Sequence, residues 1–394
     1  MNFSFTREQD ELREEVRGFL QEELDKGSFT THTAALIGPE DMEFSRKMSE
    51  RGWIGITWPK EYGGQGRSYV DKMIMLEECY KVQAPIGHHF LADRQVGPAI
   101  MTFGSDWQKE HFLPKIIKAE DDSSFCLLFS EPNAGSDLAA VSTKAVKDGD
   151  HYIITGQKVW TSSGHRAAYG WLLAKTELSG TQPQHRSLSE FILDMKSPGV
   201  TIRPIIDMTG GHSFNEIFLD EVKIHKKYLV GQENGGFRQI MAQMDYERAG
   251  IERLMQNYPV FSMLVEHVKS LKEEGRDPEF YTWAKDQTAQ LEIEYNAGRL
   301  LCYYTAWLVD QGEKPSAQAA LCKAFCTLYE QRLVDLCLRI LGPASQIRPG
   351  DKWAVLGGEP ADSYLWAPSY TLQGGSVEVL KNIVAQRGLA LPRS

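Results

Sequence analysis

The chain has 394 residues, of which 42% are apolar and 10% aromatic, and it carries a formal net charge of −10 at pH 7. At roughly 100–200 residues per domain, this length predicts two or three domains with sizeable cores. The negative charge disfavours nucleic acid as a partner, and no apolar run of about 18 residues suggests a membrane span. Residues 1–24 are rich in Glu, Asp and Arg and lack the apolar core of a signal peptide, which indicates a cytoplasmic protein.

Residues 1–122 have the pattern of a helical N-terminal domain. Thr6 and Gln9 fit a capping box at the start of a helix. The apolar residues that follow recur at helical spacing, and they are Leu12, Val16, Phe19 and Leu20. Further helical patterns cover residues 43–51 and 71–79.

Residues 123–234 change to a pattern of short strands. Residues 144–146 and 152–154 flank Asp148-Gly149-Asp150, which predicts a hairpin that turns at Asp-Gly. The further strand-like runs are 171–174, 190–193, 200–205 and 216–219. No βαβ alternation is present, so we expect a compact antiparallel β-domain and not a doubly wound dinucleotide fold.

From residue 235 to residue 394 the helical period returns and predicts a C-terminal helical bundle. Leu300, Tyr304 and Leu308, for example, share one helix face. The fold class predicted for the chain is therefore α+β and mostly helical, with a central antiparallel β-domain between two helical domains.

The cysteines favour a reducing environment without a metal. All six are scattered, mostly among apolar neighbours: Cys79, Cys126, Cys302, Cys322, Cys326 and Cys337. Cys322 and Cys326 would share a helix face, but no second pair at metal-binding spacing accompanies them, and no HExxH motif is present. We expect reduced thiols and no metal site.

Two segments of the predicted β-domain have residue types that suit a flavin. Residues 127–137 lead a strand into a tight turn of small residues and hydroxyls, where backbone N–H groups can approach a flavin or a phosphate closely. In residues 156–164, Trp160 places an aromatic plane beside hydroxyl groups. Taken singly, the first segment is equally compatible with an ordinary strand-to-loop junction, and the second with a partly buried core tryptophan.

Together these segments resemble the flavin-binding strands of the acyl-CoA dehydrogenase family, whose usual forms are T-E-P-x-A-G-S-D and K-x-W-I-T-N-G. Residues 55–64 resemble the family's early W-P-x-E-Y-G-G loop, and residues 104–116 its G-T-x-x-Q-K…L-P-x-I segment. Residues 375–381 are similar to the closing G-T-S-E-I-x-R motif. The five motifs occur in family order and span almost the whole chain. The resemblance implies FAD as cofactor, an acyl-CoA substrate and α,β-dehydrogenation of that thioester, with electron-transfer flavoprotein as the acceptor.

The resemblance also implies which residues line the flavin. By motif position these are Leu127, Phe129, Ser130, Gly135, Ser136, Trp160, Thr161, Ser162, Ser376 and Glu378. Ser162 stands where the family usually has Thr, so a hydroxyl is kept, whereas Thr161 replaces a typical Ile.

The catalytic base is expected on the first helix of the bundle. In many family members a carboxylate immediately precedes the closing motif, but Gly374 occupies that position here and can offer only its backbone N–H to the thioester carbonyl. A second branch places its base in an E-R pair, which corresponds to Glu247 as base and Arg248 as a neighbouring positive group. A solvated surface pair is the alternative interpretation of Glu247 and Arg248. Ser136 and Asp245 match positions near the thioester ligand.

One departure from the family concerns assembly. Residues 271–280 do not keep the R-x-x-F-G pattern that binds the FAD of a neighbouring subunit, and residues 341–345 stand where a G-G-x-G run is common. This favours a heteromer in which this chain carries the base and a related subunit supplies the missing FAD contacts. A homo-oligomer in which Arg276 binds the pyrophosphate is equally compatible. The alternative function is a non-catalytic or chemistry-altered subunit that acts with a related partner.

Overall fold

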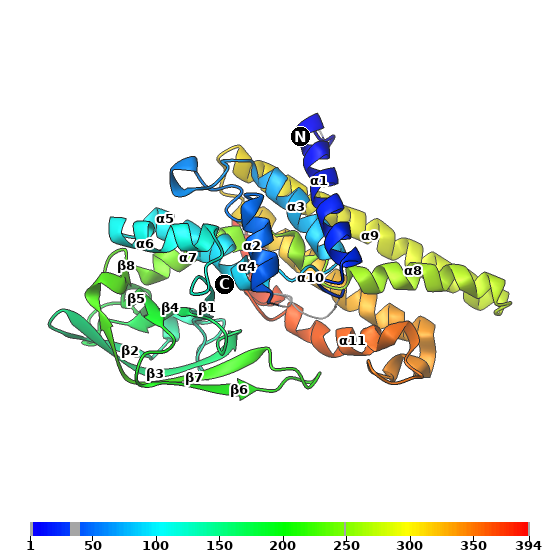
Figure 1. Ribbon diagram of the computed structural model, residues 1–394. Helices are drawn as coiled ribbons and strands as arrows, with labels where there is room; N and C mark the ends of the chain where they lie inside the picture. The colour runs from blue at the N-terminus through cyan, green and yellow to red at the C-terminus, as the bar shows by residue number, and fades with distance from the viewer. Residues whose placement is uncertain (1–2, 32–39, 248–249, 393–394) are drawn as a thin grey trace. The chain divides into compact units, whose positions relative to one another are not determined.

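The computed structural model describes residues 3–31, 40–247 and 250–392, with the backbone alone described at 244–247. The chain divides into two compact units. Unit 1 comprises Met1–Pro39, Arg67–Pro85 and Arg248–Ser394, and unit 2 comprises Glu40–Gly66 and Ile86–Glu247. The expected class is confirmed, because helices precede and follow a central β-sheet along the chain (Figure 1). Each unit draws on more than one of the three segments expected from the sequence.

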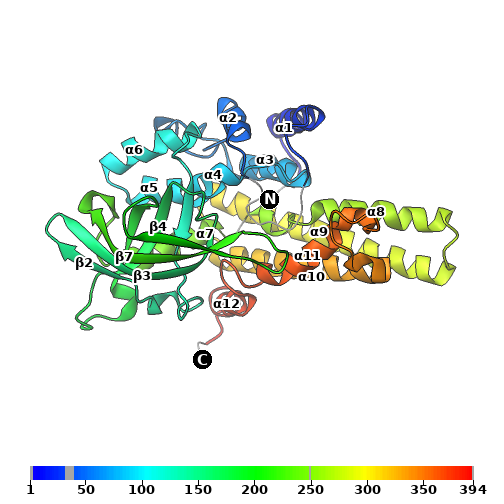
Figure 2. The ribbon, with the colours of Figure 1, turned by 60° about the horizontal axis from the view of Figure 1, so that its bottom comes forward.

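Unit 1 is helical. Its α-helices are α1 (Arg7–Asp25), α3 (Tyr69–Lys81), α8 (Tyr258–Glu273), α9 (Pro278–Asp310), α10 (Ser316–Leu341), α11 (Glu359–Tyr370) and α12 (Val377–Ile383). Helix α1 begins at the expected capping box of Thr6 and Gln9 and buries the predicted apolar face against the unit's core. Helices α8, α9 and α10 run side by side in both ribbon views, and α9 packs on α10 (Figures 1 and 2).

Buried ion pairs tie three helices of unit 1 together. Glu77 on α3 accepts hydrogen bonds from Arg13 Nη1 on α1 at 2.9 Å and from Arg299 Nε on α9 at 2.5 Å. The hydroxyl of Tyr303 donates to the same carboxylate at 2.5 Å. Burial alone would raise the pKa of Glu77, but the two guanidinium groups outweigh it and hold that pKa at about 2.

Unit 2 holds the sheet and the shorter helices. Its α-helices are α2 (Met42–Glu50), α4 (Gly87–Leu91), α5 (Gly97–Phe103), α6 (Asp106–Ile117) and α7 (Gly236–Glu247). The strands are β1 (Phe125–Leu128), β2 (Lys144–Asp148), β3 (His151–Ser162), β4 (Tyr169–Lys175), β5 (Leu188–Asp194), β6 (Val200–Ile205), β7 (Phe214–His225) and β8 (Leu229–Val230). Among the described residues of the whole chain, no helix is both long and apolar enough to cross a membrane.

The strand order is β6-β7-β3-β2-β4-β5-β8, with β1 paired to β4. The expected hairpin is confirmed: β2 and β3 pair antiparallel from Lys144 opposite Thr155 to Asp148 opposite His151, and Gly149 takes the left-handed φ of +58° that the turn requires. Figure 2 shows β2, β3 and β7 side by side.

The short strands predicted a sheet that is antiparallel throughout, and the structure differs in two places. Strand β1 runs parallel to β4, and Lys144 of β2 pairs with Lys175 of β4 in the parallel sense. Parallel neighbours need a long connection, and the excursion of the chain through β2 and β3 supplies one between β1 and β4. Residues 170–174 of β4 and 188–193 of β5 are all buried, so these two strands form part of the core of unit 2.

Candidate active site

The two predicted flavin segments lie side by side in unit 2. The backbone N–H of Val159 on β3 donates to the carbonyl of Ser130, just beyond β1, at 2.9 Å. Lys158 Nζ donates to the carbonyl of Phe129 at 3.1 Å and to Glu131 Oε1 at 2.8 Å. The end of β1 and the middle of β3 are therefore joined through main-chain and side-chain contacts, although the segments are far apart in the sequence.

Glu131 shapes the loop that follows β1. Its carboxylate accepts hydrogen bonds from Ser142 N and Oγ, both at 2.7 Å, and from Thr143 N at 2.9 Å, as well as the one from Lys158. Burial by itself would raise the pKa of Glu131, but the Lys158 charge and these donors outweigh it and hold that pKa at about 2. At neutral pH the ionised Glu131 carboxylate therefore joins the two ends of the loop from Ser130 to Thr143 by hydrogen bonds.

Trp160 is not a core residue. Its side chain is 59% exposed, and its ring lies perpendicular to that of Phe214 at a centroid distance of 6.0 Å. The register of β3 against β7 shifts between Lys158 and Thr161, and Trp160 takes a left-handed φ of +59° at this irregularity. A large residue held in this conformation costs on the order of 1–3 kcal/mol, and such strain is concentrated at functional sites. The exposure excludes the buried-tryptophan alternative.

Most of the other predicted flavin contacts of unit 2 are accessible. Gly135 and Ser136 are exposed, whereas Leu127, Phe129, Ser130 and Ser162 are half-buried. Thr161 is buried, and its Oγ1 has no hydrogen-bond partner among the described residues. A Cβ added to Gly135 would meet nothing within 4 Å. An exposed indole beside hydroxyls, an unpaired buried hydroxyl and a loop with open space fit the planar, polar-edged ring of a flavin.

The predicted base lies on helix α7. Glu247 is the last residue of this helix, and Asp245 lies two residues before it. The side chains of Asp245 and Glu247, and all of Arg248, lie outside the described residues. Their expected roles stay predictions.

The closing motif belongs to unit 1. Gly374 and Gly375 have left-handed φ values of +66° and +97°, and the buried Lys323 Nζ donates to the carbonyl of Gly375 at 2.6 Å. Ser376 caps α12 by accepting from Val379 N at 3.4 Å, and Glu378 is exposed in the first turn of that helix. These residues are described within unit 1, and the structure does not place them against the β1–β3 residues of unit 2.

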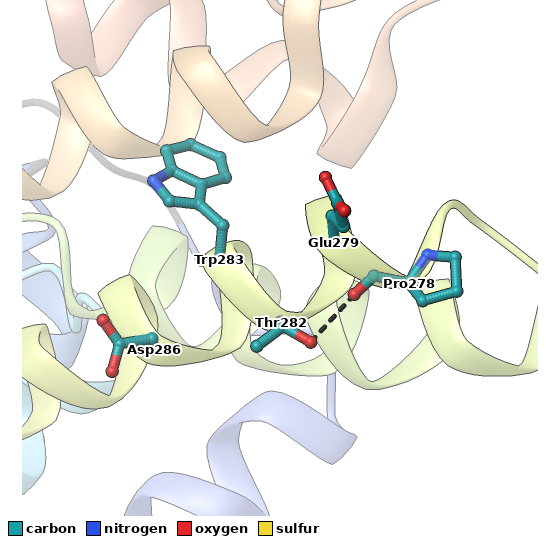
Figure 3. A pocket seen from close by; sticks show the side chains of 5 residues that line it. All are labelled: Pro278, Glu279, Thr282, Trp283 and Asp286. Carbon is teal, nitrogen blue, oxygen red and sulfur yellow. Dashed lines mark hydrogen bonds between the residues drawn. The ribbon is translucent and has the colours of Figure 1, made fainter.

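A shallow hollow lies on α9, next to the segment where the family pattern for a neighbour's FAD is missing. It is lined by Pro278, Glu279, Thr282, Trp283 and Asp286, and Figure 3 shows Glu279 and Trp283 projecting to the same side of the helix. Arg339 covers the Trp283 ring at 5.3 Å. The five lining residues include the carboxylates of Glu279 and Asp286, whose charge opposes pyrophosphate binding, while the Arg339 guanidinium lies beside them on the Trp283 ring.

Three of the cysteines meet in the core of unit 1. The Sγ atoms of Cys302, Cys322 and Cys326 lie 3.4, 4.0 and 4.0 Å apart, and all three side chains are fully buried. These are contact distances for packed sulfurs. No fourth His, Cys, Asp or Glu joins the group within the part of the chain that the structure describes, so a metal held here would have only three protein ligands.

Sequence reasoning missed Glu190 of β5. This residue is fully buried on β5, between β4 and the short edge strand β8, and its carboxylate reaches α7, the helix that ends at Glu247. The available signal was a charged residue directly before the apolar run of residues 191–193 in the same strand. The pair of glutamines four residues apart on α7, Gln239 and Gln243, was a second signal.

Sequence comparison relates the chain to known proteins along nearly its whole length. Residues 6–120, 126–222 and 234–389 match the N-terminal, middle and C-terminal domains of acyl-CoA dehydrogenase. Acyl-CoA dehydrogenase FadE26 of Mycobacterium tuberculosis (strain ATCC 25618 / H37Rv) is 32% identical over 411 residues, which cover 100% of both chains. Acyl-CoA dehydrogenase IpdE1 of the same strain is 32% identical over 399 residues, covering 98% of each chain.

Solved structures agree with this relationship. The Tcur3481-Tcur3483 steroid ACAD superposes with a TM-score of 0.89 at 30% identity, and the ChsE4-ChsE5 complex from Mycobacterium tuberculosis with 0.84 at 31%, each covering 100% of both chains. The full-length matches and the order of helical, sheet and helical segments show that the chain belongs to the acyl-CoA dehydrogenase family, whose members are FAD-dependent oxidoreductases acting on CH–CH bonds.

Proposed function

We propose that this chain is the base-carrying subunit of a heteromeric acyl-CoA dehydrogenase that removes two hydrogens across the α,β bond of a CoA thioester. The observation that carries the proposal is the pairing of two positions. Glu247 ends helix α7 where one branch of the family has its base, and Gly374 leaves the other family position without a side chain.

Each of the predicted site residues has a separate role in the proposed reaction. The Glu247 carboxylate takes the α-proton, and Arg248 holds the ligand or the local structure beside it. Ser136 and Asp245 contact the thioester end of the substrate. The Gly374 N–H donates to the thioester carbonyl and stabilises the enolate-like charge that develops there.

FAD, when bound, supplies the acceptor for the β-hydride. Trp160 would pack against the flavin, and the other contacts of unit 2, from the ends of β1 and β3, would help to hold it: Leu127, Phe129, Ser130, Gly135, Ser136, Thr161 and Ser162. Ser376 and Glu378 of the closing motif contact the same cofactor. Electron-transfer flavoprotein is the proposed electron acceptor.

The proposed assembly rests on the α9 region. Residues 271–280 do not keep the R-x-x-F-G pattern that binds a neighbour's FAD in the family, and the five residues that line the hollow beside them include two carboxylates. Two of the similar structures carry the names of paired chains, Tcur3481 with Tcur3483 and ChsE4 with ChsE5. The first of these is named a steroid ACAD, so the proposed substrate is the CoA thioester of a steroid side chain.

Replacement of Glu247 by Gln tests the base. The flavin-loaded enzyme is assayed with a panel of acyl-CoA thioesters that includes steroid side chains. Glu247→Gln should retain the flavin and lose activity by about 10²–10⁴-fold, because an amide cannot accept the α-proton. Glu221→Gln, on the exposed edge of β7, is the matched control. Near-wild-type turnover of Glu247→Gln would remove this residue from the mechanism and favour the non-catalytic or chemistry-altered subunit.

Expression of the chain alone tests the assembly. The amount of flavin per chain and the turnover are measured with and without a co-expressed related subunit. Low flavin content that rises with the second subunit supports the heteromer. Full flavin occupancy and full activity from the single polypeptide would rule it out.

A further inference from the structure

Four side chains form a buried polar group between the sheet and α7, which we call the Glu190 clamp. Glu190 on β5 accepts hydrogen bonds from Trp171 Nε1 on β4 at 2.6 Å and from Gln239 Nε2 on α7 at 2.7 Å. Gln243 Nε2, one turn further along α7, reaches both carboxylate oxygens at 3.1 Å. Glu190 and Trp171 are fully inaccessible, and the two glutamines are at most 5% exposed.

The Glu190 carboxylate accepts a hydrogen bond from each of the three partners. Trp171, Gln239 and Gln243 all present N–H donors to it, and an ionised carboxylate accepts without needing an acceptor in return. A protonated acid or an amide at position 190 would keep one acceptor oxygen and add a donor, and Gln243 Oε1 is a buried acceptor without a hydrogen-bond partner among the described residues. The groups that reach the carboxylate from β4 and α7 are uncharged, and β8 places Val230 opposite Glu190 in the ladder. Burial without a cation raises the pKa of Glu190 to about 7, against the opposing effect of the three donors.

The clamp and the predicted base share one side of α7. Gln239 and Gln243 are four residues apart, and another step of four reaches Glu247, so all three occupy one stripe of the helix. The start of α7 is held by other contacts. Gly236 packs so closely on the Ser189 backbone that an added Cβ would lie 2.9 Å from it, and Ile240 packs in the core. Gln243 is thus the last described tether of α7 to the sheet before Glu247.

We propose that Glu190 is a positioning residue for the reaction, which holds the last turn of α7, and with it the backbone of Glu247, through Gln239 and Gln243. The inference rests on Glu247 being the base. A displacement of about 1 Å at a reacting group can lower turnover about 100-fold. Burying a carboxylate whose partners among the described residues are all uncharged is energetically unfavourable, and the position of Glu247 one turn beyond the clamp supplies a reason for it.

The variants separate positioning from general stability. Glu190→Gln keeps the side-chain volume, removes the charge and replaces one of the two acceptor oxygens by an NH₂ donor. Gln243→Met removes one donor and leaves the carboxylate in place. The double variant Glu190→Gln with Gln243→Glu exchanges amide and carboxylate and restores one hydrogen bond between them. Glu330→Gln is the matched control, because Glu330 in unit 1 is also a fully buried carboxylate, held by Asn257 Nδ2 and the backbone N–H of Gln256.

Two measurements are made on each flavin-loaded variant, together with its partner subunit if that is required for loading. Hydrogen exchange reports the backbone amides of residues 243–247 directly. Steady-state kinetics with protiated and α-deuterated thioester give kcat, KM and the isotope effect on kcat. Glu190→Gln should speed exchange in the last turn of α7, lower kcat about 10–100-fold with KM within about threefold, and raise the isotope effect. Gln243→Met should show the same pattern more weakly, and the double variant should recover part of kcat.

The outcomes are distinct. Unchanged exchange at residues 243–247 in Glu190→Gln overturns the clamp, whatever Glu247 does. Faster exchange with wild-type kcat and isotope effect overturns the positioning role. Glu330→Gln matching the kinetic change of Glu190→Gln would also overturn it, since any buried carboxylate would then have the same effect. Turnover by Glu247→Gln decides the proposed function on its own, so failure of the base and failure of the clamp are told apart.

Discussion

Two buried carboxylates of unit 2 are held in opposite ways, one beside the predicted flavin strands and one behind helix α7. Glu131, at the end of β1, has the buried Lys158 as a partner, and its pKa is held at about 2. Glu190, on β5, has only uncharged donors, and its pKa is raised to about 7. The Glu131 carboxylate at the β1–β3 junction therefore stays ionised throughout the neutral range, whereas the Glu190 carboxylate at the β5–α7 junction can change its protonation state there.

Unit 1 contains the same contrast. Glu77 is paired with Arg13 and Arg299 and has a pKa of about 2. Glu330 accepts from Asn257 and from backbone N–H groups, and burial raises its pKa to about 8. In both units burial opposes ionisation of the core carboxylates, and the two that have a lysine or arginine partner are the two whose pKa is lowered.

The largest expected effect comes from removing the cation of the first region. Lys158→Met leaves Glu131 buried with a charge and without its counter-ion, which should lower the free energy of unfolding by about 3–5 kcal/mol. Urea unfolding at neutral pH measures the change. The double variant Lys158→Met with Glu131→Gln removes both charges and should be less destabilised than the single variant. A loss below about 1 kcal/mol for Lys158→Met would mean that the ion pair does not hold the junction.

The second prediction concerns pH and the carboxylate without a cation. The folded-state pKa of Glu190, about 7, lies above its ordinary value of 4.5. Its contribution to stability is therefore full below about pH 4.5 and is lost as the pH rises through 7. The difference in unfolding free energy between wild type and Glu190→Gln should fall by on the order of 3 kcal/mol between about pH 5 and pH 8. Glu131 has the opposite sign, with a contribution lost only as the pH falls from about 4.5 towards 2, so it does not affect this window. A difference that is flat with pH would show that Glu190 does not titrate there.

The third prediction compares one tryptophan from each region. Trp160 is exposed, so Trp160→Ala should change the unfolding free energy by less than about 1 kcal/mol while it weakens flavin retention or shifts the flavin absorption bands. Trp171→Phe removes the N–H that Glu190 accepts and should cost about 1–3 kcal/mol with an unchanged flavin spectrum. Flavin absorption and urea unfolding are measured on both. If Trp160→Ala destabilises the fold and leaves the spectrum unchanged, Trp160 does not contact the flavin.

The smallest effect on folding is expected at Gly135. Alanine there meets open space, so the unfolding free energy should change by no more than about 0.5 kcal/mol. Flavin affinity, measured by titration of the flavin-free enzyme, should still fall, because the added methyl group keeps the loop backbone away from the cofactor. Gly156→Ala on β3 is the control, since its Cβ would lie 2.4 Å from Thr143 Oγ1 and should destabilise the strand. Unchanged flavin affinity in Gly135→Ala would remove the loop from the cofactor site.

The sequence by itself determined the local features of this protein and the order of its segments. The capping box at Thr6 and the turn at Gly149 depend on residues within a few positions of each other, so short-range chemistry was sufficient to predict them. The five motifs identified the family because each is a contiguous run of residues. The roles of Glu247, Arg248 and Gly374 remain predictions of that kind.

Only the tertiary structure decided which distant residues meet. The ion pair of Lys158 with Glu131, the approach of Cys302 to Cys322 and Cys326, and the Glu190 clamp each join segments separated by a turn, a strand or a whole helix. The exposure of Trp160 likewise follows from a register shift between β3 and β7, which has no signature in either strand alone. Spacing along the chain predicts which residues share a face, whereas burial and partners depend on how faces far apart in the sequence pack, and these decide the protonation state of each core carboxylate.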